Sequence, residues 1–429
     1  MRLAKKVKLQ PTKRQEHELR KHAAARRWAW NWGLECKEKA WKERKAQIDS
    51  GTPKDKCTKV PSAFGLSNMI TPLISLPESE GGTWWKKGEI NRCAPVSALR
   101  DLEQAFGNMF GGSHKRPRFQ GYRQGHGGFK LFGSIVAKNQ AIKLPTIGYI
   151  RITPGQHGYI PPGKIKQIQL TQRAGQWYAS TPDMEVDEMD LDDTRPIVGI
   201  DRGVSVLIAL SDGTVCENPK ALKKYQRKHR RLCKAISRKV GGSKKVKKSN
   251  NCKKAIAARN RLEERISNLR DHAINKATKE IAKKYSVIVL EDLQLKNMTR
   301  KAKGKGKAAK SGLNKSILDS CLGKIRQQLE YKALLYGSRI EYVKPHYTSQ
   351  MCSVCGCIDR ANRKSQAVFK CVGCGYEENA DFNASKNIRN LFVAGVCPET
   401  QSACGEDVSP VGIARRQTSV KQESVPSGT

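Results

Sequence analysis

In the stretch IVGIDRG at residues 197–203, a mainly aliphatic run ends at Asp201. Gly203, which permits a bend, follows two residues later. A second run, VIVLEDL at residues 287–293, ends in the same way with Glu291. Short aliphatic and β-branched runs are typical of buried strands, so we expect each carboxylate at the tip of a strand. The sheet would then hold both side chains in fixed positions.

A third isolated carboxylate, Asp381, lies in NADFNASKNI at residues 379–388 and is expected at the start of a helix. The helix dipole favours a carboxylate there even without a metal. Alternation along the second strand puts Glu291 and Asp292 on opposite faces, and it leaves open which face meets Asp201. Three carboxylates that converge in this way can hold two Mg²⁺ ions, as in many nucleases that hydrolyse phosphodiesters.

The charge of the chain indicates a polyanionic partner. The 429 residues include 81 Lys and Arg against 39 Asp and Glu, a formal net charge of +42, and nucleic acid is the partner that such a surplus favours. No apolar run reaches the roughly 18 residues of a membrane span, and the start MRLAKKVKLQPTKRQ lacks the apolar region of a signal peptide. We therefore expect a soluble protein that is not secreted and has no membrane partner.

The first part of the chain is expected to be helical. Thr12 and Gln15 match a capping box, and apolar residues recur at helical spacing through residues 12–47. A loop region rich in Pro, Gly and Ser should follow, and a second helix is expected at residues 95–110. We assign the Trp and Phe residues of these helices to core packing rather than to base stacking.

Strands are expected next. Residues 115–178 consist of short alternating runs separated by Gly and Pro, with a turn at Ala174-Gly175, which is typical of β-hairpins. The stretch DMEVDEMDLDD at residues 183–193 contains seven acids and no base, and we interpret it as a solvated linker. Residues 197–215 should form a hairpin that turns at Asp212-Gly213.

A strongly basic segment follows. Residues 219–270 contain 20 Lys and Arg against two acids, interleaved with apolar residues that suit two amphipathic helices joined at Gly241-Gly242. An unbalanced charge run repels itself unless phosphates neutralise it, so we favour a nucleic-acid surface over a merely solvated face. The candidate contacts on the first helix are Lys223, Lys224, Arg227, Arg230 and Arg231.

The later part of the chain alternates helix and strand. A flexible tract of Gly and Lys is expected at residues 300–310, then one helix at 316–336, and then the strand SRIEYVKP at 338–345. Residues past 394 lack periodicity and are expected to form a disordered tail.

Four cysteines have the spacing C-x₂-C-x₁₅-C-x₂-C, in the knuckles CSVCG and CVGCG: Cys352, Cys355, Cys371 and Cys374. Four thiolates close a tetrahedral shell around Zn²⁺ and leave no open position, so we expect one structural zinc ion. An iron–sulfur cluster is the alternative, and the ribbon spacing favours zinc. Cys357 is then a bystander, and the remaining thiols are expected to be free in a reducing compartment.

The order of the motifs closely resembles that of TnpB, the RNA-guided nuclease family of insertion sequences. The motifs are GIDRG, the basic helical pair, VIVLEDL, YTSQMCSVCG and FKCVGCGYEENADFNASKNI. The resemblance runs from about residue 196 to 394, with weaker similarity in RRWAWNWGL and RPRFQGYRQGHGGFKL. It implies a RuvC-type active site of Asp201, Glu291 and Asp381, and it selects Glu291 over Asp292. Two departures, Arg202 in place of a frequent apolar residue and ADFNAS in place of an Ala-Ala ending, leave the acids intact.

The resemblance also implies an architecture. It is an α/β chain with a RuvC-like RNase H fold and an inserted zinc ribbon, preceded by a β-rich barrel of the wedge or oligonucleotide-binding type that carries a helical recognition insertion. The expected domains are the first wedge strand (1–11), helical recognition domain (12–114), wedge barrel (115–182), acidic linker (183–196), nuclease domain (197–347), zinc ribbon that binds target nucleic acid (348–376), last nuclease helix (377–394) and disordered tail (395–429).

The function implied by the resemblance is RNA-guided cleavage. A guide RNA, either a transposon-end noncoding RNA or a CRISPR RNA, would pair with double-stranded DNA beside a short adjacent motif. One site with two Mg²⁺ ions, or Mn²⁺ in their place, would cut both strands in turn, and a monomer is expected. The resemblance also implies a cytoplasmic prokaryotic protein that acts at the nucleoid. The alternatives are a compact type V CRISPR effector, a non-cleaving RNA-guided repressor, a transposase and a ribosome-type basic protein. An intact triad argues against a repressor, because clustered acids without a metal repel one another.

Overall fold

The structure, a computed structural model, describes residues 2–121, 127–155, 160, 162–185, 188–240, 249–301 and 306–395. The expected tail after residue 395 and the joint at Gly241-Gly242 therefore lie outside the described residues. The chain divides into two compact units: unit 1 comprises residues 1–190, 219–279 and 334–337, and unit 2 comprises 191–218, 280–333 and 338–429. Both units combine helices with sheets, which confirms the α/β class.

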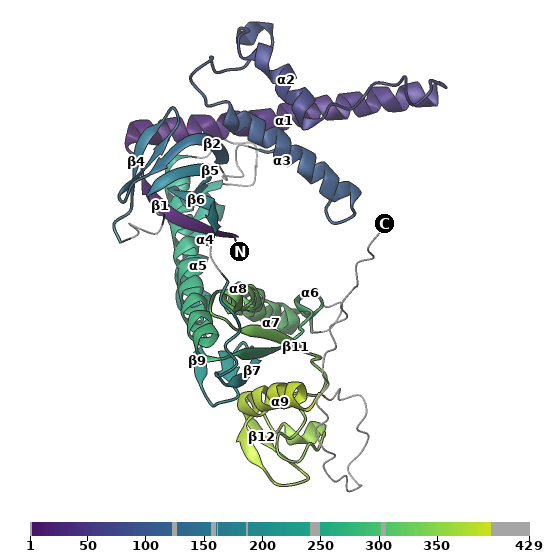
Figure 1. Ribbon diagram of the computed structural model, residues 1–429, viewed down its shortest axis with the longest axis vertical. Coiled ribbons are helices and arrows are strands. Elements are labelled where there is room, and N and C mark those ends of the chain that lie inside the picture. Colours follow the sequence, from purple (N-terminus) through teal and green to yellow (C-terminus); the bar gives the residue numbers. More distant parts are fainter. Residues whose placement is uncertain are drawn as a thin grey trace, which may run out of the picture. The chain divides into compact units, whose positions relative to one another are not determined.

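Unit 1 contains a closed six-stranded barrel with the strand order β1-β4-β3-β2-β5-β6 (Figure 1). Its strands are β1 (Arg2–Gln10), β2 (Gly128–Ala137), β3 (Ala141–Leu144), β4 (Gly148–Ile152), β5 (Gly163–Arg173) and β6 (Gln176–Glu185). Alternating side chains such as Phe129, Leu131 and Ile168 fill its core. The predicted turn at Ala174-Gly175 is present, with φ of +47° and +81°, as a tight hairpin requires. The expected β-rich barrel is therefore confirmed.

The helices of unit 1 begin with α1 (Lys13–Asp49), which the reciprocal Thr12–Gln15 capping box starts as predicted. The helix α3 (Cys93–Phe110) agrees with the expectation at residues 95–110. Between them the sequence predicted only loop, and this is wrong. The helix α2 (Ala63–Leu73) forms there because Ser62 caps it by accepting a hydrogen bond from the Gly65 amide, and Leu66 and Ile70 are buried one turn apart.

Two long basic helices follow, α4 (Ala221–Val240) and α5 (Asn250–Lys284). Within unit 1, Tyr225 of α4 packs beside Leu262 and Ile266 of α5, so the apolar faces predicted from the sequence do meet. No helix within the described ranges is long and apolar enough to cross a membrane.

Unit 2 is built on a five-stranded sheet with the order β11-β10-β7-β8-β9. Its strands are β7 (Ile197–Asp201), β8 (Val206–Leu210), β9 (Val215–Glu217), β10 (Val287–Glu291) and β11 (Arg339–Val343). The first three strands are antiparallel neighbours, whereas β10 runs parallel to both β7 and β11. The helix α9 (Ala380–Ala394) packs on this sheet, chiefly on its central strand β7.

The single helix expected at residues 316–336 is instead two helices, α7 (Lys307–Ser320) and α8 (Leu322–Leu335). Cys321 separates them with φ +51°, a left-handed conformation that ends a helix. A short helix α6 (Leu295–Met298) precedes them. The cysteine-rich segment adds the small antiparallel pair β12 (Val368–Lys370) and β13 (Glu377–Asn379), directly before α9.

Candidate active site and metal centre

Asp201 and Glu291 lie at the carboxyl ends of two adjacent parallel strands. In the register of β7 and β10, Ile200 is paired with Leu290, so the next residue of each strand is a carboxylate. Catalytic groups are commonly found at this edge of a parallel sheet. The sequence places these two acids at strand ends, and the fold brings the strand ends side by side.

Asp381 reaches the same place through α9. Asn379 caps this helix by accepting a hydrogen bond from the Asp381 amide (2.9 Å), as expected for a carboxylate in the first helical turn. The close approach of α9 depends on Gly199 of β7, since a Cβ atom there would lie 2.2 Å from the Ser385 carbonyl oxygen and 2.6 Å from the Arg389 nitrogen. Only glycine lets the helix backbone rest on the central strand.

Core contacts identify the face of β10 that strand alternation left open. Val287 and Val289 pack against Ile388 of α9, so the alternate residue Glu291 points to the face that α9 covers. Asp292 instead accepts a hydrogen bond from Arg326 of α8 (2.7 Å). Glu291, and not Asp292, is therefore near the helix that carries Asp381.

The three carboxylates line one pocket of about 330 Å³ within unit 2. Arg363 and Gln366, from the segment between the two cysteine knuckles, line it as well. Among the described residues, the four cysteines are the only group of three or more His, Cys, Asp or Glu whose ligand atoms all lie within 4.8 Å of one another. The carboxylates are thus arranged around an open space, which suits a site that must admit a substrate.

The charges of this pocket oppose one another. Burial, reinforced by the negative charges of Glu291 and Asp381, raises the pKa of Asp201 to about 7. Burial also raises the pKa of Glu291, which is 8 % exposed, and that of Asp381, while Arg363 lowers the pKa of Asp201 and Asp381. Carboxylates held together in this way need a compensating cation in order to be ionised together.

Arg202, one of the two departures from the resemblance, lies beside the pocket. Its side chain is 5 % exposed, and its Nη2 donates a hydrogen bond to the backbone oxygen of Glu291 (2.5 Å). The guanidinium thereby bridges the ends of β7 and β10 directly beside the two acids. This hydrogen bond goes to the backbone of Glu291, while the charge of Arg202 lowers the pKa of the Glu291 carboxylate.

The four predicted zinc ligands form a compact cluster. The Sγ atoms of Cys352 and Cys374 are 3.7 Å apart, and those of Cys355 and Cys371 are 3.5 Å apart. Zn–S bonds of about 2.3 Å in a tetrahedron require sulfur–sulfur distances of about 3.8 Å, so the donor set fits Zn²⁺. None of the four is in a disulfide.

Local backbone geometry supports the cluster. Gly356 and Gly375, which close the two knuckles, both have φ +75°, and the Cys374 amide points at the Cys371 sulfur (3.4 Å). Cys357 packs beside this cluster but does not belong to the set of four. The Cys₄ site predicted from the spacing is therefore formed in the structure.

The five candidate nucleic-acid contacts lie on α4. The side chains of Lys223, Lys224, Arg227, Arg230 and Arg231 are all exposed. In contrast, the apolar residues of the same helix, such as Leu222 and Tyr225, turn toward α5. The cations are therefore available to phosphates along one helix.

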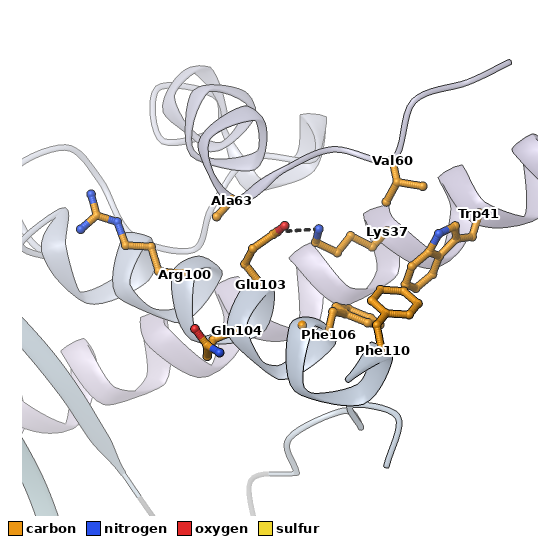
Figure 2. Close-up of a pocket in the computed structure, with 10 residues that line it drawn as sticks. Lys37, Trp41, Val60, Ala63, Arg100, Glu103, Gln104, Phe106 and Phe110 are labelled. Atoms are coloured by element: carbon orange, nitrogen blue, oxygen red, sulfur yellow. Dashed lines mark hydrogen bonds and ion pairs between the residues drawn. The ribbon is translucent and has the colours of Figure 1, made fainter. Parts of the chain in front are cut away.

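The aromatic residues of α1 and α3 mostly pack on one another. Figure 2 shows Trp41, Phe106 and Phe110 grouped at one end of a pocket of about 630 Å³ in unit 1, with the ion pair of Lys37 and Glu103 beside them (2.8 Å). Trp41 meets Phe106 edge-on at 4.7 Å, and Phe106 is 3 % exposed. Phe110 contacts the same two rings, with centroids 5.9 Å from Trp41 and 6.4 Å from Phe106, but it is 69 % exposed.

Sequence reasoning missed several residues of the pocket region. Thr348 donates a hydrogen bond to the Glu291 carboxylate (2.5 Å), Arg363 lines the pocket, and the buried Asn383 and Asn387 anchor α9. The asparagines had a usable signal, because two amides four residues apart share one face of a helix whose other residues there are apolar. Thr348 and Arg363 had none, since the carboxylates that they meet in the pocket are distant from them in sequence.

Comparisons with known proteins agree on one family. Three family models match: "Helix-turn-helix domain" at residues 1–46, "Probable transposase" at 183–302 and "Cas12f1-like, TNB domain" at 323–388. In the described part of 1–46, the chain forms strand β1 and most of the single helix α1. The first match therefore covers no pair of helices joined by a turn.

Relatives match over nearly the whole chain. "Putative RNA-guided DNA endonuclease InsQ" of Escherichia coli is 33 % identical over 94 % of this chain and 94 % of that protein. "Putative RNA-guided DNA endonuclease" of Streptomyces pristinaespiralis is 27 % identical over 97 % of this chain and 95 % of that protein. "CRISPR-associated endodeoxyribonuclease Cas12f1" of Sulfoacidibacillus thermotolerans is 53 % identical, but over only 15 % of each chain. A solved structure of CasPhi-2 bound to crRNA has a TM-score of 0.40 and 12 % identity, covering 94 % of this chain and 99 % of that one.

Proposed function

Because this chain belongs to the TnpB family of RNA-guided DNA endonucleases, we propose that it cuts double-stranded DNA selected by a bound guide RNA beside a short adjacent motif. The observation that carries the proposal is the meeting of Asp201, Glu291 and Asp381 in one pocket. Base pairing would read the target sequence, while the protein would supply the backbone contacts and the cutting site.

The sheet of unit 2 supports a RuvC-like RNase H fold. Taken in chain order, its strands have the spatial order 3-2-1-4-5, with the first three antiparallel and the last two parallel to the first. In this reading the zinc ribbon at residues 348–376 is an insertion before the last helix, and it contacts target nucleic acid. The barrel and helices of unit 1 act as wedge and recognition domains.

The three carboxylates form a donor set that suits Mg²⁺, which prefers oxygen ligands. Two such ions bound there would supply positive charge for activating a water nucleophile and for stabilising the leaving oxygen. Asp201, Glu291 and Asp381 would hold them, and each must be ionised to do so. The raised pKa of Asp201 means that it is only partly ionised at neutral pH until a cation is present.

Arg363 supplies the remaining positive charge of the pocket. It lines the pocket with the three acids, and its charge lowers the pKa of two of them. A guanidinium there can donate paired hydrogen bonds to a phosphate oxygen of the bound DNA. Since the part of the chain described here presents one such triad, both DNA strands would be cut in turn at the same site.

The zinc ion has a structural role in this scheme. Four thiolates leave no open coordination position, so the ion holds the ribbon without touching the reaction. The exposed cations of α4 bind the guide RNA or its duplex with the target through phosphates. These contacts carry affinity, whereas pairing carries specificity.

A compact type V CRISPR effector is the second candidate, and a non-cleaving repressor is the third. The match to InsQ spans 94 % of both chains, whereas the matches to two Cas12f1 proteins span 15 % and 61 % of this chain, which favours the transposon-type nuclease. The intact triad favours cleavage over repression.

The RNA that copurifies with the chain tests this function. Sequencing should return a noncoding RNA from a transposon end, and the complex should linearise a plasmid that carries the matching target when Mg²⁺ is added. Processed repeat–spacer RNA would instead identify a CRISPR effector. Binding of the matched target without any cut would identify a repressor.

A further inference from the structure

A tight turn joins β11 to the first cysteine knuckle. Tyr347 adopts φ +59°, and its carbonyl oxygen accepts hydrogen bonds from the amides of Gln350 (2.8 Å) and Met351 (2.9 Å). A left-handed conformation at a bulky residue costs free energy, and it persists where the surroundings fix it. This turn sets Thr348, only 4 % exposed, into the wall of the carboxylate pocket.

Thr348 makes two contacts that lead in different directions. Its Oγ1 donates a hydrogen bond to the Oε1 of Glu291 (2.5 Å), and its carbonyl oxygen accepts one from the Nδ2 of Asn387 (2.9 Å). Asn387 belongs to α9, the helix whose first turn carries Asp381. A single residue therefore connects one pocket carboxylate on β10 with the helix of another.

Two asparagines extend this connection to the zinc site. The Nδ2 atoms of Asn387 and Asn383 both donate to the carbonyl oxygen of Met351, at 2.6 Å and 2.8 Å, and the Oδ1 of Asn383 accepts from the Ser353 amide (2.9 Å). Met351 and Ser353 are the two residues that flank the ligand Cys352. The backbone on both sides of a zinc ligand is thus fastened to α9.

The choice of residue type argues for a positioning role. Asn383 and Asn387 are 0 % and 1 % exposed, and apolar side chains of similar size would fill the same space without needing partners. A buried amide costs free energy in every arrangement that leaves it without hydrogen-bond partners. Such residues therefore favour one specific arrangement of the elements that they join, and they add little net stability. Here the arrangement that satisfies both amides is one position of α9 relative to the backbone of residues 351–353.

From these contacts, and resting on the proposed function, we propose that Thr348, Asn383 and Asn387 are positioning residues that fasten two pocket carboxylates to the zinc knuckle. Thr348 fixes the orientation of Glu291. The two asparagines fix the position of α9 along its axis relative to Cys352, and this also fixes the position of Asp381. The ribbon would then determine the shape of the pocket as well as contact nucleic acid.

The hydroxyl of Thr348 is tested in the full chain with its guide RNA by comparing Thr348→Val with Thr348→Ser. We expect Thr348→Val, which keeps the shape and loses the donor, to raise the Mg²⁺ concentration for half-maximal cleavage about tenfold. The maximal rate at saturating Mg²⁺ should fall much less. Thr348→Ser should restore half-saturation to within about twofold of the wild type. Equal half-saturation in Thr348→Val and the wild type would overturn this part.

The asparagines are tested without any cleavage. In Asn387→Ala and Asn383→Ala, amide hydrogen exchange over residues 380–388 and the rate of zinc release to a colour-forming chelator should each rise about tenfold. Asn390→Ala is the matched control, because Asn390 is on the same helix and reaches the Ser353 oxygen only at 3.5 Å. Its exchange and zinc release should stay within about twofold of the wild type.

Exchange and zinc release that change no more in Asn387→Ala than in Asn390→Ala would overturn the link between α9 and the knuckle. Both readouts are independent of catalysis. If the chain proved unable to cut DNA, the proposed function would fail while this link could still be measured.

Discussion

The cysteine cluster and the carboxylate pocket are two candidate metal sites in one unit, and they are built on opposite principles. The four thiols already lie within 4.8 Å of one another, on knuckles whose glycines have the conformation that the site needs. The three carboxylates surround an open pocket of about 330 Å³ and oppose one another electrostatically. The first site is closed and complete, whereas the second is open and depends on what enters it.

This difference separates folding from chemistry. When a metal ion binds the four thiolates, the free energy of binding stabilises the folded ribbon. A cluster of buried acids does the reverse, because ionisation of each group disfavours ionisation of the others. Removing a cysteine should therefore damage structure, and removing a carboxylate should damage catalysis while leaving the fold intact.

The largest expected effect comes from the carboxylates. Asp201→Ala, Glu291→Ala or Asp381→Ala should each lower the Mg²⁺-dependent cleavage rate by about a thousandfold or more, since metal assistance contributes several kcal/mol. Guide RNA binding should change little. Single-turnover cleavage and filter binding measure the two properties. Asp292→Ala is the control, and it should still cut, because Asp292 pairs with Arg326 outside the pocket; retained cleavage in any of the three would remove that acid from the site.

The cysteine site should respond through stability. Cys352→Ser or Cys374→Ser should release about one zinc ion per chain and loosen the ribbon, because zinc binding supplies roughly 10 kcal/mol or more in such modules. Metal analysis and limited proteolysis between residues 348 and 380 provide the measurements. Cys357→Ser is the matched control and should keep its zinc, since Cys357 is outside the set of four. Wild-type protein without zinc or iron would contradict the assignment.

Gly199 tests whether the open pocket depends on the packing of one helix. A Cβ atom in Gly199→Ala would lie 2.2 Å from the Ser385 carbonyl oxygen, so α9 must move and the free energy of unfolding should fall by about 3 kcal/mol. Thermal denaturation measures the change. Gly312→Ala is the control: this exposed glycine of α7 has no atom within 4 Å of an added Cβ, and the change should stabilise by about 0.5–1 kcal/mol. Equal melting temperatures for both variants would show that α9 does not need the glycine.

The basic face of α4 should affect affinity and neither metal site. Replacing Lys223, Lys224, Arg227, Arg230 and Arg231 by Gln should weaken RNA binding and flatten its salt dependence, by somewhat under about 0.9 in log–log slope for each lost phosphate contact. Target specificity should persist. Lys39→Gln with Arg20→Gln is the control, because these cations pair with Glu35 and Glu16 on their own helix. An unchanged salt slope would show that these five cations of α4 are solvated and make no phosphate contacts.

The smallest effect concerns the electrostatics of the pocket without Mg²⁺. The folded state raises the pKa of Asp201 from 3.8 to about 7, so folding favours the protonated acid, and that stability is lost as the pH rises through this value. Asn cannot ionise, so zinc-loaded Asp201→Asn should melt about 2–4 °C above the wild type near pH 8. The gap should shrink steadily as the pH falls toward about 5.5. A gap that widens on acidification would contradict the raised pKa.

The sequence was sufficient where the signal is local. Strand ends at Asp201 and Glu291, the helix start at Asp381 and the cysteine spacing all follow from residue patterns a few positions long. Strand alternation left the choice between Glu291 and Asp292 open. The family resemblance favoured Glu291, and the contact of Val289 with α9, which no pattern within β10 contains, agrees with that choice.

Other features could not be foreseen for different physical reasons. The loop assignment over α2 gave Pro and Gly composition more weight than the Ser62 cap and the spacing of Leu66 and Ile70. The break between α7 and α8 was not predicted because the residue in the left-handed conformation is Cys321 rather than a typical turn residue such as glycine. Thr348 is recognisable only once β10 and the knuckle are placed side by side.

The packing of α9 on Gly199 also bears on the order of events during synthesis. Asp381 leaves the ribosome about 180 residues after Asp201, which takes on the order of 10–40 s at common elongation rates. Until then the central strand β7 lacks the helix that covers it, and the pocket lacks one of its three acids. A nascent chain could therefore bind RNA through α4 before it could cut DNA, so guide loading can begin while the nuclease site is still incomplete.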